Sequence, residues 1–488
     1  MSDLRAPGIT LSGRRAIALG VAFVALLLIL GGGTLLRAEA PASQATHSPQ
    51  VGRTTMICTT SAPLSAAARA KTEISAVAIR EAPDRPGSLS ASTLDTKSVK
   101  LKLSEPGKGA PPFRTNASIV IAADGAMATA SSAVIVDDVT GGNEAGLKAA
   151  PCLAPATAHW FSGLGATDED RTDLILSNPD DAQAQVDLRY YGRSGRIAVP
   201  GSPGLVIRGH DSHTVSLADL GGESPVSVAI QASQGRVTAV AKRAQTRRRI
   251  EPAGIDWQVP SVSPNRVVVI PGVPADEGGR QLVVTNPNNS RATVAVQVLG
   301  FQGPYAPSGA ASVDVPPEGT ASVNLEPGLA GEAAGIKLTS DVPVTGAVIA
   351  TSRRGGKGTD LAVQSAAAPL IGTGVSALAT TNIADSQLII SNGGDSDAQV
   401  TFEVFSYDGV RLRTDDVVLA ANSTATRRLN SPAPSYVVVN APDDSSVVAG
   451  VVLTQPDRDV AGLATIPLSS PDLASRAPAT RPDYSAGR

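Results

Sequence analysis

The chain has 488 residues, a formal net charge of −3 and only 3% aromatic residues. This length suits about three or four domains, and the near balance of charge gives no global electrostatic field that would attract nucleic acid. Val, Ala, Leu and Ile supply most of the apolar fraction, and Gly and Pro are frequent, which is typical of many short strands joined by turns.

The first predicted element is a membrane-spanning helix over residues 16–36. This segment, AIALGVAFVALLLILGGGTLL, contains no charged residue, and a run of about 20 apolar residues is what a bilayer core requires. Arg5, Arg14 and Arg15 precede it, which predicts that residues 1–15 lie in the cytoplasm and that the C-terminal part lies outside. We therefore expect a single-pass protein of the cell membrane.

A cleaved secretion signal is the alternative for this segment. The sequence AEA at 38–40 has the small-x-small form of a cleavage site, although Pro41 follows where cleavage is disfavoured and the apolar run is long for a signal. A retained anchor is the preferred interpretation, with residues 37–51 as a linker. If the segment is cleaved, the protein is secreted.

Two cysteines, Cys58 and Cys152, lie in the predicted exported part. An even number of cysteines outside the cell is most simply a disulfide, and closing so long a loop is worth about 4–5 kcal/mol in the chain-entropy model. Two buried free thiols are the alternative. The sequence has no C-x-x-C spacing, so neither interpretation supports a redox centre.

One phrase recurs three times along the chain. DLILSNPDDAQAQVDLRYYG begins at Asp173, QLVVTNPNNSRATVAVQVLG at Gln281 and QLIISNGGDSDAQVTFEVFS at Gln387. Self-similarity at spacings of 108 and 106 residues indicates tandem domains, because solenoid units are shorter. Each copy predicts a strand, a turn at Asn followed by Pro or Gly, and a half-buried strand with apolar residues at alternate positions. The Asn is thus interpreted as a turn residue and not as a ligand.

The repeats predict an all-β protein with about four tandem immunoglobulin-like β-sandwich domains after one N-terminal transmembrane helix. A propeller with one blade per repeat is the alternative, but a blade usually needs only about 40–50 residues. Residues 52–155 are predicted to be a degenerate first copy that contains the disulfide, because the segments 96–104 and 117–135 match the second half of the unit. The predicted sandwiches cover residues 52–155, 156–262, 263–368 and 369–470, and a disordered tail covers 471–488.

Arginine clusters follow corresponding predicted strands in two of the repeats. Arg247, Arg248 and Arg249 occupy one loop, and Arg353 and Arg354 occupy its counterpart in the next repeat. If these loops lie on one edge of the array, they could bind phosphate-rich wall polymers or lipid headgroups. Solvation is the more common role of charge runs in hairpin tips. The five arginines are candidate loops for an anionic ligand.

Two other polar groups have structural interpretations that compete with metal binding. The segment His210–His213 aligns with a turn of the sister repeats, which favours a solvated turn over a metal site. The acidic pairs Asp168/Asp170 and Asp395/Asp397 lack the Gly and terminal Glu of a calcium-binding loop.

No residue pattern typical of catalysis occurs in the sequence. There is no G-x-S-x-G elbow, no phosphate-binding loop and no H-E-x-x-H. Trp160-Phe161 and Trp257 could form a sugar platform, but in a chain so poor in aromatic residues they are expected in the core between sheets. We therefore predict no catalytic residue, no cofactor and no metal site, and the protein is not expected to be an enzyme.

Three segments carry a resemblance to a known family: MICTTSAP from Met56, PCLAPATAHWFSG from Pro151 and DLILSNP from Asp173. With the N-terminal apolar span, they make the chain resemble an uncharacterised actinobacterial family of exported, membrane-anchored proteins, known only as a domain of unknown function. The resemblance covers most of the exported part. It implies a location in the envelope of a high-GC Gram-positive cell and assigns no catalytic residue.

These observations predict a non-catalytic extracytoplasmic scaffold or protein-interaction arm of the cell envelope, since such modules present loops and edge strands. Its expected partners are a cell-envelope protein or a wall polymer, and the membrane through the N-terminal helix, with no nucleic acid. The alternative is a binder of cell-wall glycan or anionic polymer through the basic loops, whose affinity would fall as ionic strength rises.

Overall fold

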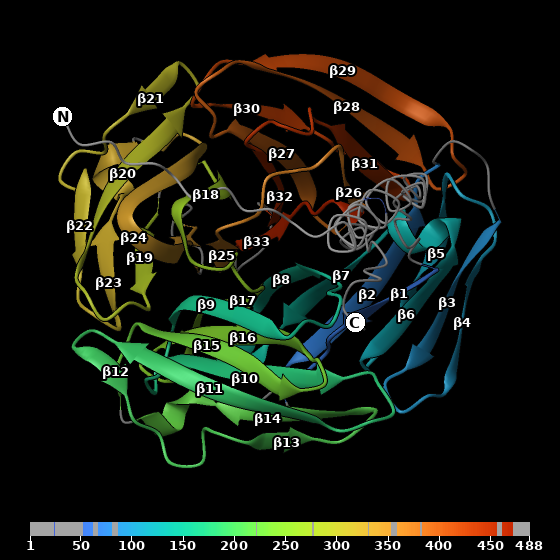
Figure 1. Ribbon diagram of the computed structural model, residues 1–488. Coiled ribbons are helices and arrows are strands. Elements are labelled where there is room, and N and C mark those ends of the chain that lie inside the picture. Colours follow the sequence, from blue (N-terminus) through green and yellow to red (C-terminus); the bar gives the residue numbers. More distant parts are fainter. Residues whose placement is uncertain are drawn as a thin grey trace, which may run out of the picture. The chain divides into compact units, whose positions relative to one another are not determined.

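The computed structural model describes Val24 and residues 52–61, 67–80, 86–220, 222–275, 278–329, 331–352, 359–380, 383–455 and 461–471. Gln50–Arg476 forms one compact unit, and the described strands all lie within it (Figure 1). These strands pair antiparallel in small sheets, so the prediction of an all-β chain is confirmed.

The strands fall into four consecutive groups, which we call the first to fourth repeats. The first repeat contains β1 (Arg53–Cys58), β2 (Arg69–Ala78), β3 (Gly87–Thr93), β4 (Ser98–Leu103), β5 (Lys108–Arg114), β6 (Ile119–Gly125), β7 (Ser131–Thr140) and β8 (Gly146–Pro151). The second contains β9 (Ala158–Leu164), β10 (Asp170–Asn178), β11 (Ala184–Gly192), β12 (Gly195–Ile197), β13 (Leu205–Ile207), β14 (Asp211–Ser216), β15 (Val226–Gln234), β16 (Thr238–Arg247) and β17 (Glu251–Gln258).

The other two groups follow the same order. The third repeat contains β18 (Asn265–Val273), β19 (Arg280–Asn286), β20 (Ala292–Gly300), β21 (Gly303–Tyr305), β22 (Ser312–Val315), β23 (Gly319–Asn324), β24 (Ala334–Thr351) and β25 (Leu361–Ser365). The fourth contains β26 (Thr373–Leu378), β27 (Asp385–Asn392), β28 (Ala398–Ser406), β29 (Arg411–Leu419), β30 (Ser423–Arg428), β31 (Ser435–Asn440), β32 (Val447–Gln455) and β33 (Gly462–Pro467). Short helical turns are η1 (Ala126–Thr129), η2 (Gly142–Glu144), η3 (Leu217–Leu220) and α2 (Glu326–Leu329).

The strands of each repeat pair in the same order. In the second repeat one sheet has the order β14-β10-β16-β17, and the other has β12-β11-β15-β9 with β13 also on β11. The fourth repeat has β30-β27-β32-β33 and β29-β28-β31-β26, and the first has β5-β2-β7-β8 and β4-β3-β6-β1. In the third repeat the long β24 pairs with strands of both kinds. A propeller with one blade per repeat is therefore wrong, and the first repeat shares the topology of the others.

The predicted alternation of buried and exposed residues holds for some strands and fails for others. In β20, Val294 and Val296 are buried in the core of the third repeat, while Thr293 beside them is exposed. In β19, however, Val283 is as fully buried as its neighbours Leu282 and Val284. Leu282 and Val284 face the core of their own repeat, whereas Val283 lies in a separate cluster at its other face. Strand β9 of the second repeat contacts β19, and a Cβ at Gly163 would meet Val283. Strand β19 is thus buried on both faces, because a neighbouring repeat packs against it.

Asn178, Asn286 and Asn392 end equivalent strands and hold the turns that follow. Each is at most 1% exposed. The side-chain oxygen accepts from the backbone N–H two residues on at 2.9–3.0 Å, as predicted for a turn residue. The side-chain nitrogen donates to the carbonyl four residues on at 2.7–2.8 Å. It also donates to a carbonyl about thirty residues further on, at 3.0–3.2 Å.

A disulfide joins Cys58, the last residue of β1, to Cys152, which directly follows β8. The bond closes the first and last strands of the first repeat, and both residues are buried. The predicted pairing is confirmed, and the alternative of two free thiols is wrong. Ile57 and Leu153 beside it also form a backbone bridge, so the covalent link lies within a paired stretch.

The predicted N-terminal elements lie outside the described residues. Residues 1–15, the span 16–36 apart from Val24, and the linker 37–51 are not among them, and neither is the tail 472–488. Among the residues that the structure describes, none belongs to a helix with the length and apolar character needed to cross a bilayer. The anchor therefore stays a prediction from the sequence.

Candidate functional site

The last strands of the four repeats, β8, β17, β25 and β33, come together at the centre of the described unit (Figure 1). β8 contacts β17, β17 contacts β25, β25 contacts β33, and β33 contacts β8. The contacts therefore close on themselves, and the fourth repeat packs against the first. Tandem sandwiches linked only to their neighbours would not make the contact between β33 and β8.

Asp360 is a buried polar residue that connects the last strands of the repeats. It is 0% exposed, and its carboxylate accepts four backbone N–H groups. Oδ1 accepts from Ile255 and Leu361, each at 2.9 Å. Oδ2 accepts from Leu147 at 2.8 Å and Leu463 at 2.9 Å. These donors belong to the last strands of all four repeats, so one side chain connects the whole centre.

Asp256 has the corresponding role in the second repeat. Its Oδ1 accepts from Trp257 at 2.8 Å and Ala149 at 3.2 Å, and its Oδ2 accepts from Val363 at 3.0 Å. Burial raises the pKa of Asp256 well above its ordinary value, and the nearby Asp360 adds to that rise. Burial also raises the pKa of Asp360 to about 7, although its four backbone donors oppose the rise.

A buried ion pair of the first repeat lies beside these carboxyl groups and is contacted by the second repeat. Lys148 on β8 is 3.2 Å from Asp137 Oδ2, and both side chains are almost fully buried. The Trp257 indole N–H donates to the same oxygen at 2.7 Å, and the Lys148 ammonium lies 4.5 Å from the centre of the Trp257 ring. The hydrogen bond and the ring contact of Trp257 therefore attach the second repeat to this ion pair, and removing one partner of such a buried pair is costly.

The first and fourth repeats also meet at two hairpins. The backbone N–H of Gly109 donates to the Tyr407 carbonyl at 2.9 Å, and the Tyr436 hydroxyl donates to the Gly107 carbonyl at 3.0 Å. A Cβ at Gly109 would overlap the Tyr407 ring, so the close approach of the two hairpins requires glycine there. The closure between the repeats is thus built into the sequence of both.

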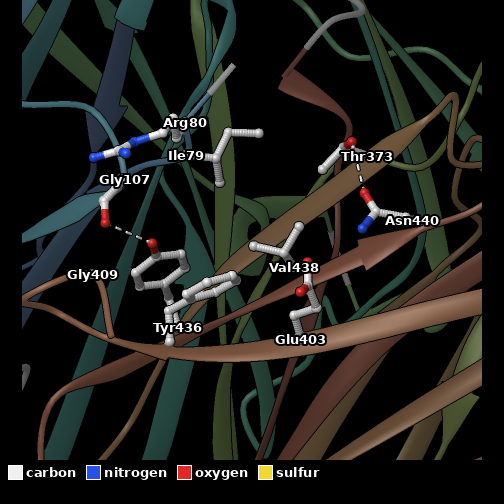
Figure 2. Close-up of a pocket in the computed structure, with 10 residues that line it drawn as sticks. Ile79, Arg80, Gly107, Thr373, Glu403, Gly409, Tyr436, Val438 and Asn440 are labelled. Atoms are coloured by element: carbon white, nitrogen blue, oxygen red, sulfur yellow. Dashed lines mark hydrogen bonds between the residues drawn. The ribbon is translucent and has the colours of Figure 1, made fainter. Parts of the chain in front are cut away.

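A pocket of about 360 Å³ opens beside this contact (Figure 2). Residues of the first and fourth repeats line it: Ile79, Arg80, Gly107, Thr373, Glu403, Phe405, Gly409, Tyr436, Val438 and Asn440. Burial raises the pKa of Tyr436 to about 12, so its hydroxyl stays a neutral donor. The pocket therefore combines aromatic and aliphatic walls with one cation, one carboxylate, one amide and hydroxyl groups.

The predicted basic loops do not line this pocket. Arg247, Arg248 and Arg249 lie at the turn between β16 and β17, and Arg248 and Arg249 have positive φ angles of 50° and 64°. Arg247 donates to the Thr359 hydroxyl at 3.3 Å, and Arg249 pairs with Asp168 at 2.7 Å. Arg353 and Arg354 lie outside the described residues. Two of the three described guanidinium groups are thus engaged by the protein itself.

In the segment His210–His213, His210 lies in a turn, as the repeat alignment predicts, whereas Asp211 to His213 belong to strand β14. His210 has a positive φ of 57°, and its sister residues Glu318 and Asn422 have 47° and 53°. His210 Nε2 lies 2.7 Å from an oxygen of Asp181. In the described part of the chain, no group of three or more His, Cys, Asp or Glu side chains is placed to hold a metal ion.

The acidic pairs make contacts within the protein. Asp168 pairs with Arg249 and Asp170 with Arg243, at 2.7 Å and 2.5 Å. Asp395 contacts Lys337 at 3.3 Å, and Asp397 accepts from the backbone N–H of Ala421 at 3.0 Å.

The large aromatic residues serve two different interfaces. Phe161 lies in the core of the second repeat, as expected. Trp257 does not lie between the sheets of its own repeat; it packs into the core cluster of the first repeat. Trp160 is half-buried and stacks on Tyr191 with ring centres 6.1 Å apart. The expectation of an inter-sheet core position is thus wrong for Trp257, because packing between repeats needs a large apolar side chain there.

Sequence reasoning missed the pocket and both central carboxyl groups. Asp256 and Asp360 stand at equivalent positions in GIDWQV and GTDLAV, and an isolated Asp in an otherwise apolar strand is a signal for buried hydrogen bonding. The pocket had a weaker signal in Phe405, Tyr407 and Tyr436, which concentrate aromatic residues in the fourth repeat of a chain with six Phe and six Tyr.

Comparison with known proteins gives a family but no activity. A mutant of the major pilin of Streptococcus pyogenes matches over 64% of this chain and 99% of the pilin chain, with 7% identity and a TM-score of 0.13. A β-glucuronidase of Parabacteroides merdae matches over 58% of this chain and 34% of its own, with 9% identity and a TM-score of 0.11. No curated protein sequence matches. The sequence model of a family of unknown function, DUF5719, matches residues 103–430. The chain therefore belongs to the family of unknown function DUF5719.

Proposed function

We propose that the protein is a non-catalytic, extracytoplasmic scaffold of the cell envelope, anchored by its N-terminal helix and built from four immunoglobulin-like sandwiches. The compact unit of Gln50–Arg476 supports a rigid platform more than an extended arm. Such a platform would present loops and edge strands to a partner while the chemistry belongs to that partner.

The observation that carries this proposal is the edge strand β29. It ends its sheet, beside β28, so its outer backbone groups have no strand beyond them in that sheet. Leu412 and Val418 on β29 are 52% and 70% exposed, and Val410, which directly precedes the strand, is 60% exposed. Native proteins usually protect exposed edges, and apolar side chains on an edge strand suit the addition of an extended segment of another protein. We therefore propose a protein partner that pairs with β29.

Crosslinking in intact cells, followed by recovery of the tagged full-length protein, tests this proposal. We expect one envelope protein to be captured by the wild type and lost from the double variant Leu412→Lys, Val418→Lys, because two charges on the outer face oppose strand addition. Val206→Lys is the matched control, since Val206 lies 47% exposed on β13 of the second repeat. Equal capture by the wild type and the double variant would contradict docking on β29.

The alternative is binding of cell-wall glycan or anionic polymer through Arg247, Arg248, Arg249, Arg353 and Arg354. The same recovery experiment distinguishes it. Wall polymer without a protein, released by higher salt and lost when Arg247, Arg248 and Arg249 are replaced by Ser, would favour the polymer binder and count against the scaffold. The contacts of Arg247 with Thr359 and of Arg249 with Asp168 give this alternative less support.

A further inference from the structure

The pocket between the first and fourth repeats has the size and lining of a binding site for a small molecule. Its volume of about 360 Å³ is at the lower end of the range of about 300–1,000 Å³ for ligand pockets. It therefore suits one small molecule or the terminal unit of a chain. None of its lining residues belongs to β16 or β17, between which the predicted basic loop lies.

The apolar side of the pocket is an ordered aromatic pair. Phe405 and Tyr436 stack with ring centres 5.3 Å apart and an angle of 18° between the rings. The Tyr436 hydroxyl is held by the Gly107 carbonyl at 3.0 Å (Figure 2). Val438 and Ile79 extend the apolar surface. Tyr436 is only 2% exposed and supports the half-buried Phe405 from behind, so Phe405 is the ring against which a ligand with a flat or carbon-rich face can pack.

The polar side offers hydrogen-bonding groups in fixed orientations. The Thr373 hydroxyl donates to Asn440 Oδ1 at 3.0 Å, and Figure 2 shows the amide nitrogen of Asn440 on the side away from Thr373. A fixed amide donor beside a hydroxyl group suits a ligand that has hydroxyl groups of its own. Together with the aromatic pair, these groups favour a sugar ring.

The charges of the pocket favour an acid over a neutral sugar. Glu403 is already paired with Arg411, whose guanidinium nitrogen lies 2.9 Å from Glu403 Oε1. Arg80 lies on the first repeat, at the opposite side of the pocket, and is exposed. Among the described residues no group forms a hydrogen bond or ion pair with its guanidinium. The nearby carboxylate of Glu105, whose pKa Lys108 and Arg80 both lower, is itself paired with Lys108. The Arg80 guanidinium is thus available to a ligand, while the charge of the Glu403 carboxylate is balanced by Arg411. Arginine binds a carboxylate through two parallel hydrogen bonds.

We propose that this pocket binds a small sugar acid, with the carboxylate on Arg80, the hydroxyl groups on Asn440 and Thr373, and the ring face against Phe405. The ligand would touch both the first and the fourth repeat. Because it would bind only when these repeats are in contact, it would also stabilise the closed arrangement by mass action.

Isothermal titration calorimetry of the full-length protein tests the proposal with glucuronate, galacturonate and N-acetylmuramate, and with glucose and acetate as controls. We expect at least one sugar acid to bind about tenfold or more tightly than glucose or acetate, since a charge-assisted pair adds to the ring contacts. Failure of all three acids to bind, or acetate binding as tightly as the best acid, would overturn the proposal.

Two variants assign the roles of the residues. Arg80→Gln should reduce the affinity for the sugar acid about tenfold or more, towards that for glucose. Asn440→Ala should weaken the binding of the sugar acid, because a hydroxyl contact is lost, and should leave the weak binding of acetate unchanged. Arg208→Gln is the matched control, because Arg208 is an exposed arginine of the second repeat. This variant should bind the sugar acid as tightly as the wild type does. Sugar-acid affinity that is unchanged in Arg80→Gln would show that the acid binds elsewhere and would reject the site.

Discussion

Replacing Asp360 by Asn is expected to lower the free energy of unfolding of the full-length protein by about 2–6 kcal/mol. A carboxyl group keeps a lone pair on each oxygen in either protonation state, whereas an amide nitrogen has none to accept with. The variant therefore leaves two buried N–H groups without an acceptor, either those of Leu147 and Leu463 or those of Ile255 and Leu361. Each such group costs about 1–3 kcal/mol.

Denaturant titration monitored by circular dichroism measures this loss. Asp444→Asn is the matched control, because Asp444 is exposed on the fourth repeat, and we expect it to lie within about 0.5 kcal/mol of the wild type. An Asp360→Asn protein as stable as this control would show that the four hydrogen bonds do not hold the centre together.

The pH dependence of the same two proteins gives a second readout for Asp360. Its folded-state pKa of about 7 is raised above the ordinary value of 3.8, so the folded protein holds a proton that the unfolded chain releases between these values. The contribution of Asp360 to stability is thus complete below about pH 4 and is lost as pH rises through about 7. The difference in unfolding free energy between wild type and Asp360→Asn should therefore narrow between about pH 4 and about pH 7. A difference that widens over this range would show that the pKa of Asp360 is not raised on folding.

Replacing Asn286 by Ala is expected to lower the free energy of unfolding by about 2–5 kcal/mol. The buried amide accepts from the Asn288 N–H at 3.0 Å and donates to the carbonyls of Ser290 at 2.7 Å and Pro316 at 3.0 Å. Alanine replaces none of these hydrogen bonds, and the three backbone groups that lose a partner belong to bonds that are partly buried. The loss is larger than for an ordinary turn residue, because one side chain holds two turns at once.

Asn289→Ala is the matched control for this variant. Asn289 lies in the same turn and is exposed, so its replacement should change stability by less than about 0.5 kcal/mol. Thermal denaturation compares the two proteins directly. A similar loss of stability in both variants would show that the destabilisation comes from changing the turn and not from removing the buried amide of Asn286.

The sequence allowed the strands, turns and disulfide to be predicted because these features have signals that are local or compositional. Alternating apolar residues indicated β20, and the Asn-Pro steps at Asn178 and Asn286 indicated turns that the structure contains. Each of these amides also donates to a carbonyl about thirty residues further on, as Asn286 does to Pro316. This second hydrogen bond could not be inferred from the sequence, because it joins residues that are far apart in the chain.

Packing between repeats was the feature that the sequence pattern could not predict. The alternation of residues in the sequence predicted that Val283 faces solvent on a half-buried strand. In the structure Val283 is 0% exposed, because the second repeat covers that face. Periodicity identifies which residues share a face but does not identify what covers the second face. The pocket has the same origin, since Gly107 and Tyr436, which form one hydrogen bond, are 329 residues apart.

Differential scanning calorimetry of the full-length protein would test most directly whether the four repeats form one closed body. Because the last strands share the hydrogen bonds of Asp256 and Asp360, we predict a single transition whose van't Hoff and calorimetric enthalpies agree. Separate transitions, each with the enthalpy of one domain of about 100 residues, roughly 60–80 kcal/mol, would contradict the closure and show that the repeats unfold independently.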